Sequence, residues 1–183
     1  MKKTFFLLML VFVFACDDSD DFEPKTNAFG TQIQLEDRDP NALFQRTFIF
    51  VSITAQGGGF DFNDDGNVSF DILAQFPECA RDDSYEFQSQ LFQTKFIGEQ
   101  CEAGVSPLDG LNDYVIGAQD ETGTSFRLII RNSEDVFQEI SIDNLEIFED
   151  EQGKRTIFGE WTSFDPDFVF DVIMTETDDP QNN

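Results

Sequence analysis

The sequence predicts an all-β protein whose short antiparallel strands follow one another through tight connections. Apolar and polar residues alternate with a period of two in run after run, and stretches rich in Gly, Asp, Asn and Pro separate the runs. Beyond the N-terminus, no segment of the 183 residues has a sustained helical period. Because short connections place consecutive strands side by side, we expect an up-and-down antiparallel β-barrel or a two-sheet β-sandwich.

The first residues form an export signal. Lys2 and Lys3 precede an apolar run at 5–14, followed by Ala15 and Cys16, which is the order of a signal peptide and its cleavage site. The run is too short to cross a bilayer as a helix. The expected segments are a signal peptide at 1–15, an acidic tether at 16–28, the β domain at 29–176 and a disordered tail at 177–183.

The end of this signal indicates lipidation. Residues 13–16, VFAC, resemble the bacterial lipobox, in which the cysteine, here Cys16, becomes the first mature residue and carries acyl chains. Residues 17–21, DDSDD, resemble the acidic export signal of surface lipoproteins of Bacteroidota. The two resemblances imply a protein anchored in the bacterial outer membrane and displayed on the cell surface. The alternatives are ordinary secretion after Ala15 and a plain disordered tether.

Nine alternating runs predict the strands. They cover residues 29–35, 44–54, 68–76, 85–97, 114–118, 125–131, 139–148, 155–162 and 167–175. In the run 44–54 both faces are largely apolar, so we expect this strand to lie between two covered surfaces. The run 85–97 is a long strand bent near Gln93 or a hairpin, and residues 80–85 have room for one turn of helix.

The acidic stretch before the third run follows the pattern of a calcium loop. Oxygen-bearing residues occur at every second position, with Gly66 at the sharp turn. The candidate ligands are Asp61, Asn63, Asp65, Asn67 and Ser69, with Asp71 as a helper. Position 12, which supplies a bidentate Glu in such loops, is Ile72. The pattern therefore predicts weak Ca²⁺ binding or, as the alternative, an acidic hairpin turn without metal.

Three cysteines are present in the chain. With Cys16 carrying lipid, Cys79 and Cys101 are left as two thiols in an oxidising compartment. We therefore expect a disulfide between them, which staples the 85–97 region.

Charge and composition exclude several classes of function. Lys and Arg number 11 against 37 Asp and Glu, a net charge of −26, so nucleic acid is not an expected partner. Histidine is absent, which makes Ser and Cys hydrolases and zinc sites improbable. A glycosidase carboxylate pair stays open, although so many carboxylates make any one pair uninformative.

The order of these motifs resembles lipocalin-like lipoproteins of Bacteroidota. It consists of DFNDDGNVSFDILAQFPEC at 61–79, RDDSYEFQS at 81–89, then Cys101 and a late GEW at 159–161. The resemblance covers roughly residues 45–175 and implies a lipocalin-type barrel without an assigned substrate. The usual Asp-Gly hairpin between Phe87 and Cys101 is replaced by QSQLFQTKF.

These observations favour a non-enzymatic envelope lipoprotein that requires no cofactor. Its barrel is expected to bind a small apolar ligand or a surface protein. The runner-up is an adhesion or structural module with a filled core. An eight-stranded barrel holds either packed side chains or one small ligand, so the choice depends on the size of the inward residues. If most of these are among the 23 Phe residues of the chain, their rings would fill the interior.

Overall fold

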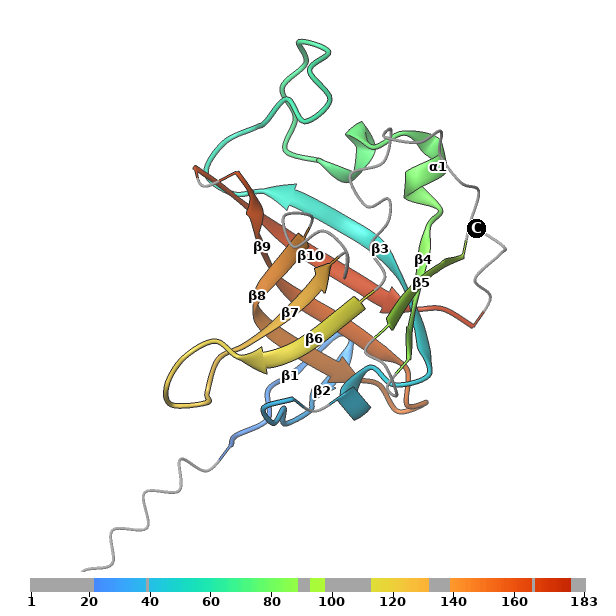
Figure 1. Cartoon of the computed structure of the whole chain (residues 1–183), viewed down its shortest axis with the longest axis vertical. Helices are drawn as coiled ribbons and strands as arrows, with labels where there is room; N and C mark the ends of the chain where they lie inside the picture. Colours follow the sequence, from blue (N-terminus) through green and yellow to red (C-terminus); the bar gives the residue numbers. More distant parts are fainter. Residues whose placement is uncertain are drawn as a thin grey trace, which may run out of the picture.

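The computed structural model of the protein describes residues 22–38, 40–88, 93–97, 113–131, 139–165 and 167–178. This part of the chain consists of antiparallel strands, with two single 3₁₀ turns and one four-residue helix as its only helical elements (Figure 1). The strands are β1 (Thr26–Asn27), β2 (Gly30–Gln32), β3 (Arg46–Ala55), β4 (Ser84–Gln88), β5 (Gln93–Ile97), β6 (Asp113–Ala118), β7 (Phe126–Arg131), β8 (Glu139–Glu149), β9 (Arg155–Asp165) and β10 (Phe168–Glu176). The helical turns are η1 (Pro40–Ala42), η2 (Leu73–Gln75) and α1 (Glu78–Arg81). The predicted all-β class is confirmed.

The strands form one antiparallel sheet in the order β1-β2-β8-β7-β6-β5-β4-β3-β10-β9. β8 pairs with β9 as well, from Ile142 opposite Trp161 to Glu149 opposite Arg155. Between β5 and β6 the described residues share one pair, Gln93 opposite Asp113. The described strands therefore all pair antiparallel. Between β5 and β6 the ladder is not continuous, so the sheet is not closed.

The predicted period of two explains the core. In β6, Tyr114 and Ile116 are buried while their neighbours are half-exposed, and in β7 the side chains of Leu128 and Ile130 are fully buried. One face of each strand thus packs inward, as alternation requires. The predicted strands 114–118, 125–131, 139–148, 155–162 and 167–175 correspond to β6 to β10.

A bulge in β3 corrects the expectation that this strand is covered on both faces. Met174 of β10 lies opposite Phe50 and Ile173 lies opposite Ser52, so Val51 has no partner on β10. The extra residue reverses which side chains point inward. Phe50 and Ile53 are buried although they differ in parity, and Val51 is 47% exposed. The sequence of β3 is therefore apolar at both parities because the inward face changes at the bulge. The strand is not covered on both faces.

The predicted strand at 68–76 is wrong. The segment between β3 and β4 makes only isolated bridges, Thr54 with Asp71 and Phe60 with Ser69, and then turns into η2. Ile72 and Phe76 are buried, whereas Val68 and Phe70 are 69% and 59% exposed. This excursion projects from the sheet in Figure 1.

Smaller differences concern the ends of elements. In the predicted run 85–97, β4 and β5 pair as two antiparallel strands, so the hairpin alternative is confirmed over the single long strand. The turn of helix lies at 78–81 instead of 80–85. At the N-terminus, β2 is shorter than the predicted strand 29–35. Thr26 and Asn27 form β1 and pair with β2, although they lie within the segment 16–28 that was expected to be a tether. The β domain therefore begins before residue 29.

Candidate functional site

The interior side of the sheet is packed with aromatic rings. Phe87 makes edge-on contacts with Phe48 and Tyr114, with ring centroids 5.6 and 4.7 Å apart, and Phe50 contacts Tyr85 at 5.2 Å. All five side chains are buried. Edge-to-face packing of this kind is the preferred geometry of aromatic pairs.

The projecting excursion covers one end of this core. Phe62 stacks on Phe76 at 4.9 Å and contacts Trp161 at 6.2 Å, while Phe60 contacts Phe170 at 5.7 Å. Gln75 fixes the excursion, since its side chain accepts a hydrogen bond from the Phe62 N–H and donates one to the Phe60 carbonyl. The ring contacts of Phe60 and Phe62 and the two hydrogen bonds of the Gln75 side chain therefore hold the excursion against the core.

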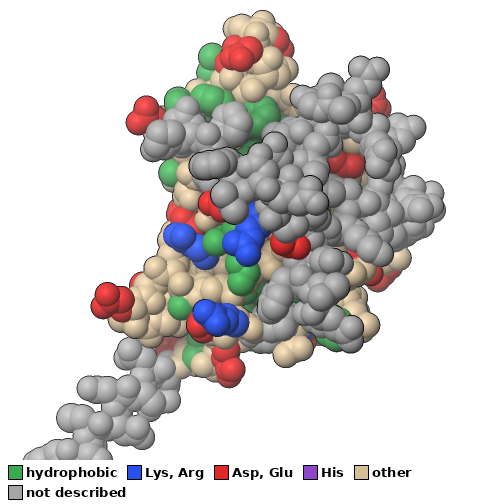
Figure 2. All heavy atoms as spheres, in the orientation of Figure 1, with side chains coloured by type: hydrophobic (Ala, Val, Ile, Leu, Met, Phe, Trp, Pro, Cys, Tyr) green, Lys and Arg blue, Asp and Glu red, His purple; other side chains and the backbone are tan. Residues whose placement is uncertain are grey.

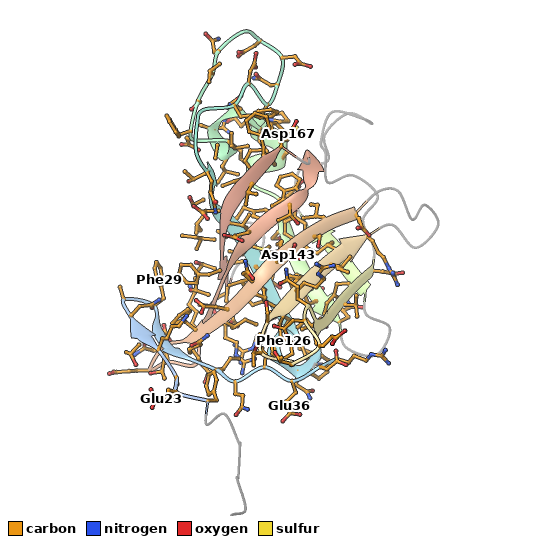
Figure 3. All side chains as sticks on the ribbon, turned by 90° about the vertical axis from the view of Figure 1, so that its left-hand side faces the viewer. Glu23, Phe29, Glu36, Phe126, Asp143 and Asp167 are labelled. Atoms are coloured by element: carbon orange, nitrogen blue, oxygen red, sulfur yellow. The ribbon has the colours of Figure 1, made fainter. Side chains whose placement is uncertain are left out.

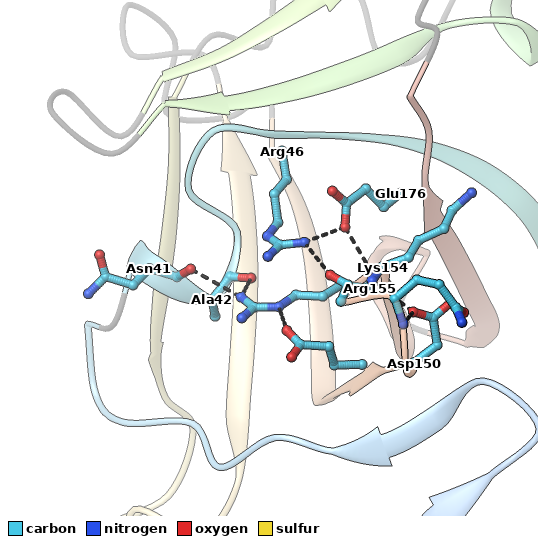
Figure 4. Close-up of polar contacts among 10 residues, drawn as sticks. Asn41, Ala42, Arg46, Asp150, Lys154, Arg155 and Glu176 are labelled. Carbon is cyan, nitrogen blue, oxygen red and sulfur yellow. Dashed lines mark hydrogen bonds and ion pairs between the residues drawn. The ribbon is translucent and has the colours of Figure 1, made fainter.

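A charged network ties together another part of the sheet (Figure 4). Arg46 donates to Glu176 at 2.5 Å and to the Gly153 carbonyl at 2.8 Å. Arg155 donates to Glu149 at 2.7 Å and to the carbonyls of Asn41 and Ala42. The network joins η1, β3, β8, β9 and β10, and the neighbouring Leu43 is fully buried. Because every contact is internal, we assign it a structural role.

The predicted calcium loop has its front half in order. Both carboxylate oxygens of Asp61 accept backbone N–H groups, from Asp65 at 3.1 Å and from Gly66 at 2.8 Å. Asn63 and Asp65 likewise accept from the N–H groups of Asp65 and Asn67. Gly66 has φ +86°, which favours glycine. The turn brings the side chains of positions 1, 3 and 5 together.

The back half of the loop does not supply the missing ligand. Ile72 is fully buried, and the Asp71 carboxylate accepts the N–H of Ala74 at the start of η2. Ser69 accepts the N–H of Asp71 through its hydroxyl oxygen. The described residues contain no group of three or more His, Cys, Asp or Glu that could hold a metal ion. The residues thus fit only the front half of a calcium loop.

A groove of about 640 Å³ lies beside β8, and sequence reasoning missed it. Residues 32–35 form one wall, residues 122–126 form the other, and residues 144–146 of β8 form the floor. The first wall is held by the hydrogen bond from the Ile33 N–H to the Ile147 carbonyl, and Asp37 accepts the Ala118 N–H just beyond it. Figure 3 shows Phe126 and Glu36 near one end of the sheet, with Asp143 further along it.

The second wall is stiffened by Asp120. Its carboxylate accepts the Thr122 hydroxyl at 2.9 Å and both the N–H and the hydroxyl of Thr124 at 3.1 Å. These hydrogen bonds, that of Thr122 first, lower the pKa of Asp120 below its ordinary value, against a smaller effect of desolvation. The loop therefore keeps a defined shape while its carboxylate is ionised.

Carboxylates form a row across the outer face of three strands. Asp143 lies opposite Glu160, which lies opposite Asp171. Arg127 Nε lies 2.9 Å from Asp143 Oδ1, and the Gln56 side chain donates to both Glu160 and Asp171, at 3.1 and 2.6 Å. Like charges opposite one another repel, and the positive charge of Arg127 and the two Gln56 hydrogen bonds offset that repulsion.

The cysteines have different outcomes. Cys79 is disulfide-bonded in the structure, but Cys101 lies outside the described residues, so the predicted pairing of the two stays a prediction. The signal peptide and Cys16 also lie outside the described residues, and lipidation stays a prediction with them. In the described part of the chain, no helix has the length and apolar character needed to span a membrane.

Comparison with known proteins gives no match: no family model, no curated protein and no solved structure matches the chain. The resemblance to lipocalin-like lipoproteins therefore depends on the motifs in the sequence alone.

Proposed function

We propose that the chain is a lipid-anchored module of the bacterial cell envelope, built as a lipocalin-like barrel, that acts through its outer surface. It binds a partner or ligand there and carries no ligand inside. The observation that supports this most strongly is the interlocked aromatic core around Phe87, capped by Phe60 and Phe62. A lumen filled by side chains has no space for a small apolar ligand.

The barrel part of the proposal is supported by strand pairing. β8 pairs with β7, and it pairs with β9 at the other end of the sheet order, so the order returns on itself. A two-sheet sandwich does not require this second pairing. The β5–β6 edge, with its single described pair, is where the two architectures differ most.

Anchoring through Cys16 is the second part of the proposal, supported by the lipobox-like VFAC and the acidic run after it. Several acyl chains give stable attachment where one is marginal. Wild-type protein should enter the detergent phase of a partition assay, and Cys16→Ala should move it to the aqueous phase. Retention of Cys16→Ala in the detergent phase would show a different anchor. Protease treatment of intact cells tests surface display separately.

We further propose that the module is not an enzyme, in line with the absence of histidine. The competing glycosidase proposal would use the neighbouring carboxylates Glu160 and Asp171, which share one donor, Gln56. Hydrolysis of a glycan by the purified protein, lost in Glu160→Gln and in Asp171→Asn, would replace the non-enzymatic proposal.

The experiment that tests the filled interior is titration with a fluorescent fatty-acid analogue. We expect no saturable binding at one site per chain, because the core leaves no room for an acyl chain. Saturable binding that is lost when Leu128 in the core is enlarged to Phe would place the ligand inside and overturn the proposal.

A second proposal is weak Ca²⁺ binding by Asp61, Asn63, Asp65, Asn67 and Ser69. The hydrogen bonds that order Asp61 and Asp65 support it. Acidic and apolar side chains gather where the excursion carrying this loop projects (Figure 2). Calcium bound there would stiffen a loop available to partners.

A further inference from the structure

The groove beside β8 exists because one edge of that strand lacks a partner over a short stretch. β7 pairs with β8 as far as Ile142, and β2 begins to pair with it only at Phe148. A bulge lies between these points, where Asn144 has φ +52°. Among the described strands, none pairs with residues 144–146 on this side. The gap leaves β8 at the bottom of a groove instead of inside the sheet.

The side chains around the groove combine an apolar base with uncharged polar groups. Leu35, Leu145 and Phe126 are buried and contribute the apolar part. The polar part consists of the amides of Gln32, Gln34 and Asn144 and the hydroxyls of Thr122, Thr124 and Ser125. The hydroxyls of Thr122, Thr124 and Ser125 already donate within the protein, so towards a ligand they act as acceptors, whereas an amide such as that of Gln34 can both donate and accept. Ligand hydroxyl groups, which do the same, match such a lining.

Charge restricts the ligand further. Among the described residues that line the groove, Glu146 is the one carboxylate; it is paired with the Lys25 ammonium and also accepts from Gln32 at 3.2 Å. No Lys or Arg is among the described residues that line it. On a chain with a net charge of −26, an anion would be repelled without compensation. A neutral ligand meets no such cost.

We propose that this groove binds a neutral, hydroxyl-rich ligand with an apolar face, of the saccharide class. The volume of about 640 Å³ is within the range of small-molecule sites. The proposal deepens, and rests on, the proposed function, because it assigns a ligand class to the outer surface. Phe22, which belongs to the predicted tether, also lines the groove. The groove therefore lies where the tether meets the β domain.

The test is a titration of the isotope-labelled mature chain carrying Cys16→Ala, followed by amide chemical shifts. The probes are the neutral disaccharides maltose, cellobiose, lactose and sucrose at tens of millimolar, with sodium gluconate as an anionic polyol. At least one disaccharide should give saturable shifts confined to residues 32–35, 122–126 and 144–146, and gluconate should give none.

Two changes at Gln34, an exposed residue of the groove wall, provide the matched variants. Gln34→Trp should abolish binding by filling the groove, and Gln34→Ala should weaken it about tenfold by removing one hydrogen-bonding group. Glu36→Trp, two residues along and outside the groove, should bind as wild type does.

Three results would overturn the inference. They are the absence of saturable shifts with all four disaccharides, equal binding of gluconate, and binding that survives Gln34→Trp. Failure of the proposed function would be distinguishable, because a fatty-acid probe would then shift core amides such as that of Leu128 and leave the groove unchanged.

Discussion

Gly159 permits the close approach of β9 to the bulge in β8. A Cβ built on this residue would lie 2.3 Å from Ile142 Cγ2 and 2.9 Å from the Asp143 carbonyl oxygen. Real Cβ atoms do not approach backbone so closely, so a side chain would push the two strands apart. The GEW segment seen in the sequence thus contains a glycine required by packing, which only the pairing of β8 with β9 reveals.

Gly159→Ala is therefore expected to destabilise the fold by about 1–3 kcal/mol, the usual cost of overpacking. Chemical denaturation followed by the fluorescence of Trp161 measures this. Gly58→Ala is the matched control, since nothing lies within 4 Å of its Cβ position, and its effect should stay within about 0.5 kcal/mol. Equal stability of the two variants would contradict the described β8–β9 register.

Asp120 gives a prediction about pH. Hydrogen bonds from Thr122 and Thr124 lower its pKa from the ordinary 3.8, so it should titrate below that value in the folded chain. A lowered folded pKa adds stability above the unfolded pKa, and this contribution is lost as the pH falls through the folded pKa. Thr122→Val should raise the midpoint measured by carboxyl NMR. An unchanged midpoint would mean that the Thr122 hydrogen bond does not hold the loop.

At the scale of elements, the sequence predicts strands well where alternation is uninterrupted, as in β6, β7 and β10. The prediction fails where one extra residue reverses which side chains of a strand point inward. The bulge at Val51 converts the pattern of β3 into an apparently two-faced strand. The 68–76 run keeps its alternation but lacks neighbouring strands, so two of its apolar residues, Val68 and Phe70, stay exposed. Such events depend on partners distant in the sequence, which a local pattern does not contain.

The candidate sites divide in the same way. The acidic loop is local, and its hydrogen bonds join residues at most five positions apart, so its front half could be predicted. The groove draws on residues 32–35, 122–126 and 144–146, which only the sheet order brings together. The local sequence does not predict the groove. Its only local indication is the turn sequence DETGT, which forms part of one wall.

The acidic loop is expected to bind Ca²⁺ at millimolar affinity, because the bidentate ligand is missing at Ile72. Calorimetry should show heat for the wild type and none for Asp61→Ala combined with Asp65→Ala. Asp64→Asn removes a charge at a position that supplies no ligand, and it should retain the heat. The absence of heat from wild type at millimolar calcium would leave a hairpin turn without metal.

The Cys79–Cys101 disulfide is predicted to stabilise the hairpin of β4 and β5. Closing a loop of this length contributes roughly 3 kcal/mol in the chain-entropy account, so Cys101→Ser should melt at a clearly lower temperature. Thiol titration of the denatured, unreduced mature protein provides the direct check. Two reactive thiols would rule the disulfide out.

At the scale of the whole molecule, the sequence left open whether the interior holds a ligand cavity or a filled core. The rings of Phe48, Phe87 and Phe170 are fully buried, which favours the filled core of the runner-up expectation over the ligand-binding barrel that was expected first. The pairing of β8 with β9 is the hairpin that their short connection predicts, whereas the pairing of β3 with β10, far apart in the sequence, has no local signature. The central claim that follows is a packed core with function on the outer surface.

The most direct measurement of that claim is the shift of the melting temperature by benzene, which enters dry apolar cavities and stabilises the proteins that hold it. Wild-type protein should show no rise in melting temperature. Leu128→Ala, which removes a fully buried side chain, should show a rise and serves as the positive control. A saturable rise in the wild type would reveal an open interior and contradict the account.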